Sequence, residues 1–85
     1  MKISVVVPAF NEEARIGETV RRIGRFMETL PNAADLIIVD DGSRDATARV
    51  VEQLQSPRLR LIRNPTNHGK GYAVKQGMRE ATGDY

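Results

Sequence analysis

The chain has 85 residues, of which 40% are hydrophobic and 28% charged, a composition that indicates a folded globular domain and excludes a disordered tail, a collagen and a coiled coil. Its net charge is only +2, and with two Tyr, two Phe and no Trp it offers neither a basic block nor an aromatic platform, so nucleic-acid binding is not expected. It has no Cys and therefore no disulfide or thiolate zinc site, and the apolar residues 3–10 are too few to span a bilayer, so we expect a cytoplasmic protein.

The first predicted element is a strand over residues 3–7, where the run Ile-Ser-Val-Val-Val has almost no polar alternation. This pattern is typical of a central strand that is covered on both faces of a parallel sheet. Pro8 is expected to end the strand, and Asn11 to cap a helix whose first turn holds Glu12 and Glu13. Apolar residues at spacings of three and four predict the buried face of that helix: Ile16, Val20, Ile23, Met27 and Leu30.

Residues 36–39 form a second, entirely apolar predicted strand, which is followed by a loop over residues 40–43. Ser43 or Asp45 is expected to cap the second helix. The buried face of that helix is predicted to consist of Thr47, Val50, Val51 and Leu54. Residues 58–63 alternate between Arg and apolar side chains almost throughout, which predicts a third strand that either has one face in solvent or lies at an edge of the sheet.

A third helix is predicted over residues 72–81, with Val74, Met78 and Ala81 inward and Gly83 as its stop. The alternation of strands and helices predicts an α/β fold, a three-layer Rossmann-like parallel sheet with the first two helices on one face and the third on the other. In such sheets ligands bind beyond the carboxyl ends of the strands. The loop at residues 8–12 and the pair at residues 40–41 should therefore border one crevice.

The acidic pair Asp40-Asp41 permits two interpretations. Carboxylates beside a buried strand are costly to bury without partners, so the pair is a candidate for binding a ligand or a metal. Alternatively, either carboxylate accepts hydrogen bonds from its own loop and from the N–H groups of the next helix, as in an Asx turn. The residue pattern leaves both interpretations open.

Gly69-Lys70-Gly71 precedes the third helix, where N–H groups and a positive charge could meet an anion. The Walker pattern needs Ser or Thr after the Lys, and the dinucleotide fingerprint needs Gly where Val74 stands, so neither is matched. The alternative is a turn with a solvated Lys70. Phe10 is a candidate for stacking on a base or for packing, and the single histidine, His68, is assigned no role.

Three segments together resemble the amino-terminal half of a family 2 glycosyltransferase with the GT-A fold. They are VVVPAFNEE at residues 5–13, IIVDDGS at residues 37–43 followed by Asp45 and Thr47, and NHGKG at residues 67–71. The last segment resembles the branch that makes polyprenyl-phosphate sugars, such as the dolichyl-phosphate glucose or mannose synthases.

The resemblance implies transfer of a hexose from a UDP- or GDP-sugar to an acceptor, such as a polyprenyl phosphate, with inversion. It implies that six residues bind the donor: Pro8, Phe10 and Glu12 at the base and ribose, Val39 and Asp41 at the base, and Lys70 near the diphosphate. Asp40 is implied to support its loop. Many members of the branch have Tyr in place of Phe10, so a hydroxyl contact made there is absent from this chain.

The resemblance also implies that functional residues of the family are missing. A later D-x-D motif holds Mn²⁺ or Mg²⁺ on the diphosphate in the family, and a carboxylate farther on is the general base. Because neither motif is present, we expect residues 1–85 to be a truncated nucleotide-sugar-binding half, without catalytic residues or metal ligands, that binds nucleotide weakly and is inactive. We expect the full-length protein at the cytoplasmic face of a membrane.

A fourth strand is expected beside residues 3–7, where the strand order would reverse, but the chain stops where that strand would start. The open edge predicts self-association of the chain. The alternative function is a non-catalytic nucleotide-binding or scaffold α/β domain. A phosphoacceptor receiver module is disfavoured, because the third predicted strand ends in Arg63-Asn64 and not in an acceptor Asp.

Overall fold

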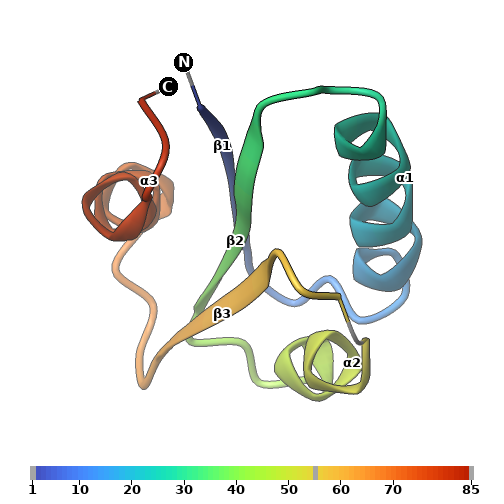
Figure 1. The fold of residues 1–85 in the computed structure, drawn as a ribbon. Helices are drawn as coiled ribbons and strands as arrows, with labels where there is room; N and C mark the ends of the chain where they lie inside the picture. Colours follow the sequence, from blue (N-terminus) through green and yellow to red (C-terminus); the bar gives the residue numbers. More distant parts are fainter. Residues whose placement is uncertain (1, 55, 85) are drawn as a thin grey trace.

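In the computed structural model, which describes residues 2–54 and 56–84, the chain forms a parallel sheet between two layers of helices (Figure 1). The elements follow in the order β1 (Ile3–Ala9), α1 (Ile16–Glu28), β2 (Ala33–Asp41), α2 (Thr47–Gln53), β3 (Leu59–Asn64) and α3 (Lys70–Glu80). The strand order is β1-β2-β3; α1 and α2 lie on one face and α3 on the other (Figure 1). The predicted fold class and the distribution of the helices are confirmed.

The central strand of the described sheet is β2. All residues of β2 from Asp35 to Asp41 are buried, whereas β1 is only partly buried except at Ala9. Within the described residues β1 pairs with β2 alone, as expected without a fourth strand; whether such a strand makes β1 central stays a prediction. The edge position also explains why Pro8 does not end β1, because a residue without an N–H is tolerated in an edge strand.

β2 is longer than the predicted residues 36–39. Asp40 and Asp41 belong to the strand and pair with Arg63 and Asn64 of β3, so the expected loop begins only at Gly42. Successive side chains of β2 point to opposite faces of the sheet. Their side chains fill two core clusters, one with Leu36 and Ile38 under α1 and α2, the other with Ile37 and Val39 under α3.

α1 begins at Ile16, and the predicted cap at Asn11 is wrong. Asn11 has a φ of 52°, a left-handed conformation that Asn tolerates better than most residues, and its N–H donates to a side chain that follows β2. The predicted buried face is largely confirmed: Ile16, Val20 and Met27 are buried and Ile23 packs against them. Leu30 lies beyond the end of the helix and is partly buried.

The predicted Ser43 cap of α2 is also wrong. The N-cap is Ala46, which has no side-chain cap, and Asp45 just before it accepts the N–H of Thr47 at 2.9 Å. Thr47 and Val51 are buried as predicted, together with Ala48, while Val50 and Leu54 are partly buried and pack against the same cluster.

α3 presents small residues to the sheet. Its buried residues are Ala73 and Gly77, whereas Met78, predicted to point inward, is 64% exposed. Val74 is partly buried, and Ala81 packs on the core from just beyond the helix. Small residues are needed here because α3 lies very close to β1: a Cβ at Gly77 would be only 2.3 Å from Cγ1 of Val6.

Gly83 also allows a close approach to β1, and the prediction that it ends α3 is wrong. The helix ends at Glu80, and a Cβ at Gly83 would lie 2.5 Å from Oγ of Ser4 in β1. Across residues 2–54 and 56–84, no helix has both the length and the apolar character needed to cross a membrane.

Candidate functional site

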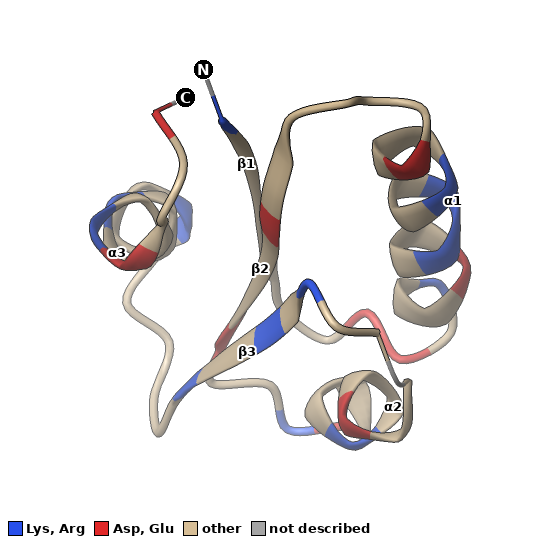
Figure 2. Cartoon of the chain, in the orientation of Figure 1, with Lys and Arg blue, Asp and Glu red and all other residues tan. Residues whose placement is uncertain are grey.

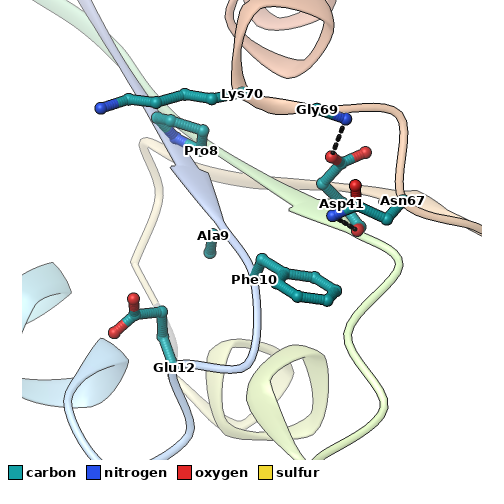
Figure 3. Close-up of a pocket in the computed structure, with 8 residues that line it drawn as sticks. All are labelled: Pro8, Ala9, Phe10, Glu12, Asp41, Asn67, Gly69 and Lys70. Carbon is teal, nitrogen blue, oxygen red and sulfur yellow. Dashed lines mark hydrogen bonds between the residues drawn. The ribbon is translucent and has the colours of Figure 1, made fainter.

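A cavity of about 490 Å³ opens at the carboxyl ends of β1 and β2 (Figure 3). Three segments that are far apart in the sequence line it, namely the end of β1 with its loop, the end of β2, and the loop that leads into α3. The lining residues are Pro8, Ala9, Phe10, Glu12, Asp41, Asn67, Gly69 and Lys70. Five of the six predicted donor-binding residues are among them, so the expected crevice is present; whether they bind a donor stays a prediction.

Val39, the sixth predicted residue, does not line the cavity. It is completely buried and packs with Ile37 and Ala73 under α3. Because side chains alternate along a strand, Val39 and Asp41 belong to the same face, and Asp41 lies two residues nearer the end of the strand. Asp41 reaches the cavity, whereas the side chain of Val39 belongs to the core.

The Asp41 carboxylate is buried and accepts hydrogen bonds from the loop before α3. Oδ2 accepts the N–H of Gly69 at 2.8 Å, the N–H of His68 lies 3.0 Å from Oδ1 and 3.1 Å from Oδ2, and Nδ2 of Asn64 donates to Oδ1 at 3.1 Å. Burial alone would raise the pKa of Asp41, but the hydrogen bonds from His68, Asn64 and Gly69 outweigh it and hold the pKa below its ordinary value. The carboxylate is therefore a stable anion.

An ionised carboxylate offers about four lone-pair positions, and these three donors leave room for one more on Asp41. Asp40 is equally buried, and its Oδ1 accepts the N–H of Ser43 at 3.3 Å, which is the support of its own loop that the resemblance implied. Both carboxylates thus have structural partners, and Asp41 also faces the cavity. Figure 2 shows the acidic end of β2 and the acidic loop before α1.

The remaining cavity residues supply an aromatic face and charges of both signs. Phe10 is 43% exposed. The carboxylate of Glu12 pairs with Arg15 at 2.6 Å, and the exposed Lys70, the first residue of α3, extends across Pro8 (Figure 3). Such a set of groups can cover a planar ring, accept hydrogen bonds from hydroxyl groups and attract an anion.

Sequence reasoning missed three of the lining residues, Ala9, Asn67 and Gly69. Asn67 donates from Nδ2 to the main-chain oxygen of Asp41 at 3.2 Å. Gly69 has a φ of 97°, a conformation that favours glycine. Asn67 and Gly69 belong to the NHGKG segment, which therefore contained the signal.

A second buried polar cluster surrounds Asp35. Its carboxylate accepts a hydrogen bond from the hydroxyl of Ser4, from the hydroxyl and N–H of Thr82 at 3.1 and 3.3 Å, and from Arg60 at 3.1 Å. Burial acts to raise the pKa of Asp35, but bonds from Ser4, Thr82 and Arg60 prevail and lower it. The cluster joins all three strands to the segment after α3 and lies outside the cavity.

Within residues 2–54 and 56–84, no group of three or more His, Asp or Glu side chains is arranged to hold a metal ion. The described residues therefore do not fit a divalent metal by themselves.

A parallel α/β sheet with helices on both faces and a cavity beyond the carboxyl ends of its strands has the architecture of the Rossmann-like class. The model of the glycosyl transferase family 2 matches residues 4–85, and the chain belongs to this family. The predicted family and GT-A fold are confirmed.

Relatives and a solved structure agree with this assignment. The chain is 37% identical over 92 residues to a dolichyl-phosphate beta-glucosyltransferase of Dictyostelium discoideum, covering 98% of this chain and 28% of that protein. It is 38% identical over 86 residues to a dodecaprenyl-phosphate galacturonate synthase of Rhizobium johnstonii, covering 98% and 25%. A similar solved structure is the mannosyltransferase PcManGT from Pyrobaculum calidifontis in complex with GDP-Man and Mn²⁺, with a TM-score of 0.80 and 28% identity over 98% of this chain and 25% of that one. The chain spans about a quarter of the length of these proteins.

Proposed function

We propose that the chain is the nucleotide-sugar-binding part of a glycosyltransferase domain, in a protein that transfers a hexose from a UDP- or GDP-sugar to a polyprenyl phosphate with inversion. The observation that carries this proposal is the cavity at which Phe10, Glu12, Asp41 and Lys70 come together. The substrate classes are supported by relatives named for dolichyl and dodecaprenyl phosphate and by a similar structure in complex with GDP-Man.

Each cavity residue has a chemical role in this proposal. The ring of Phe10 covers a face of the base or ribose, and Glu12 accepts a hydrogen bond from a ribose hydroxyl. The unused lone pair of Asp41 accepts the ring N–H of the base. Lys70 lies on the side of the diphosphate, which its charge attracts.

The chemical step needs more than these residues. Transfer creates negative charge on the leaving diphosphate, which a divalent metal stabilises in metal-dependent transferases, and the described residues do not form a metal site. We therefore expect the 85-residue chain to bind nucleotide weakly and to transfer no sugar. In the whole protein we place the reaction at the cytoplasmic face of a membrane, where a lipid phosphate and a nucleotide sugar can meet.

The test is an NMR titration of the chain with UDP, GDP, uridine and guanosine, with and without Mg²⁺, which is diamagnetic and leaves the amide signals sharp. We expect the amides of residues 8–12, 41 and 67–70 to shift and the diphosphates to bind more tightly than the nucleosides. Lys70→Ala should reduce that preference about 3- to 10-fold because it removes one charge pair with the diphosphate. The matched control is Lys75→Ala, because Lys75 is also an exposed lysine of α3 but does not line the cavity.

A second candidate function is the non-catalytic scaffold domain. If the chain is a scaffold, millimolar UDP and GDP should leave the amide signals of the cavity residues unshifted in the same titration. That result would overturn the proposed donor site and favour the scaffold.

A further inference from the structure

The loop that carries Phe10 and Glu12 is held by the loop between β2 and α2 and by Thr47, the first residue of α2. Four hydrogen bonds make this connection: Asn11 N–H to Ser43 Oγ (2.8 Å), Arg44 N–H to Asn11 Oδ1 (2.9 Å), Glu12 N–H to Thr47 Oγ1 (2.8 Å) and Glu13 N–H to Asp45 Oδ2 (3.2 Å). The main-chain N–H groups of the three consecutive residues 11–13 thus donate to side chains that lie more than 30 residues away in the sequence.

These side chains do not line the cavity, whose lining contains neither Asn11 nor any residue from 43 to 47. Because α1 begins only at Ile16, the N–H groups of residues 11–13 precede the helix and are satisfied by the neighbouring loop. Asn11 has a left-handed φ, which is energetically unfavourable and persists only where surrounding contacts stabilise it. The hydrogen bonds to residues 43 and 44 are such contacts.

Thr47 is the centre of this arrangement. It is completely buried, its hydroxyl donates to Oδ1 of Asp45, and the same hydroxyl oxygen accepts the N–H of Glu12. A hydroxyl has one hydrogen, so the bond to Asp45 turns the lone pairs of the Thr47 oxygen toward Glu12. Oδ2 of Asp45 accepts the next N–H of the loop, that of Glu13.

We propose that Ser43, Asp45 and Thr47 are positioning residues for the nucleotide: they hold the loop of Phe10 and Glu12 in its binding conformation without contacting the ligand. This inference rests on the proposed function. Its physical basis is preorganisation, since a loop that is ordered before binding does not lose conformational entropy on binding.

The test compares Thr47→Val with Thr47→Ser. Valine has nearly the shape of threonine but lacks the hydroxyl, so it removes the bond to Glu12 while the buried space stays filled. Serine keeps the hydroxyl but loses a buried methyl group, so it lowers stability and retains the bonds. The two variants therefore separate the hydrogen bonds from the packing of residue 47.

We expect Thr47→Val to weaken UDP or GDP binding about 3- to 10-fold, the effect of losing one hydrogen bond, and to speed hydrogen exchange of the Glu12 amide. Thr47→Ser should bind as the unchanged chain does, although urea unfolds it earlier. In a Glu12→Ala background, the loss caused by Thr47→Val should shrink, because part of its effect acts through the Glu12 side chain.

Equal affinities for Thr47→Val and the unchanged chain would overturn the inference, as would affinities that simply follow the stabilities of the two variants. If the unchanged chain binds neither nucleotide, the proposed function fails separately. The exchange rate of the Glu12 amide then decides whether Thr47 orders the loop, and an unchanged rate in Thr47→Val overturns that part as well.

Discussion

The carboxylate of Asp41 accepts the main-chain N–H of Gly69 at 2.8 Å, which joins the end of β2 to the residue before α3. The preceding N–H, that of His68, is directed at the same carboxylate. A buried negative charge thus orders the loop that brings Lys70 to the cavity. The same residue that faces the candidate ligand therefore also stabilises the fold.

Replacing Asp41 with Asn should destabilise the chain. The amide group has one acceptor oxygen in place of two, so an N–H donor of the loop is left without its charged partner. We expect the free energy of unfolding to fall by about 2–3 kcal/mol, since a hydrogen bond to a charged group is worth about 1.5–3 kcal/mol. Urea denaturation measures this loss.

The matched control is Asp40→Asn, at a carboxylate that is equally buried and accepts the longer bond from Ser43, at 3.3 Å. Its loss should stay below about 1 kcal/mol, the value of an ordinary hydrogen bond. Equal losses for the two variants would show that the loop between β3 and α3, residues 65–69, does not depend on the charge of Asp41.

Acid should unfold the chain through its buried carboxylates. Asp35 and Asp41 have pKa values below the ordinary 3.8 in the folded state, so the unfolded chain binds protons first as the pH falls. Their contribution to stability is therefore complete well above pH 3.8 and is lost as the pH drops through the folded pKa values. Urea midpoints measured between pH 6 and pH 2.5 should show this decline.

Asp35→Asn tests which group is responsible for the decline. The variant should be less stable at pH 6, and its midpoint should change less with acid, because one of the shifted groups has been removed. An unaltered slope in this variant would exclude Asp35 as a source of the acid sensitivity.

Gly77→Ala should destabilise the chain although alanine is the better helix former by about 1 kcal/mol. The added Cβ would lie 2.3 Å from Cγ1 of Val6 and 3.1 Å from Cγ2 of Val39, so α3 must move away from the sheet. Overpacking of this kind costs about 1–3 kcal/mol. Thermal unfolding of this variant and of Gly24→Ala gives the comparison.

Gly24 is the control because it lies within α1 and a Cβ there would meet nothing within 4 Å. Gly24→Ala should raise stability by about 0.4–1 kcal/mol. If Gly77→Ala were also stabilising, the close approach of α3 to β1 would not be a property of the chain in solution.

The free edge of β1 should make the 85-residue chain associate. Ile3 N–H donates to Asn32 on the β2 side, so by alternation the main-chain groups of Ser4 and Val6 point away from β2. The segment after α3 covers the start of this edge: the N–H of Asp84 donates to the oxygen of Lys2 at 2.6 Å, and a Cβ at Gly83 would lie 2.8 Å from the main-chain N of Ser4, so the open part of the edge begins after Ser4. We propose strand pairing between copies, which sedimentation velocity from 10 µM to 1 mM would reveal; a monomer throughout that range would contradict it.

The sequence alone was sufficient for the order of elements, the buried face of α1 and most of the cavity. Apolar periodicity identifies which residues avoid water, and the strand ends of a parallel sheet are where polar loops gather. Phe10, Glu12 and Asp41 could therefore be placed at one crevice without coordinates. The family resemblance then connected them to a nucleotide sugar.

Other features depended on contacts between distant segments. Asn11 was a plausible helix cap by residue type, but its N–H and side chain bond to the loop after β2. The inward face of α3 was misjudged because a glycine gives no apolar signal, while the space at Gly77 is set by Val6 of β1. Local periodicity reports burial, because the hydrophobic effect acts on each side chain. The choice of hydrogen-bond partner for a loop N–H is made only when the tertiary structure brings the acceptor within reach.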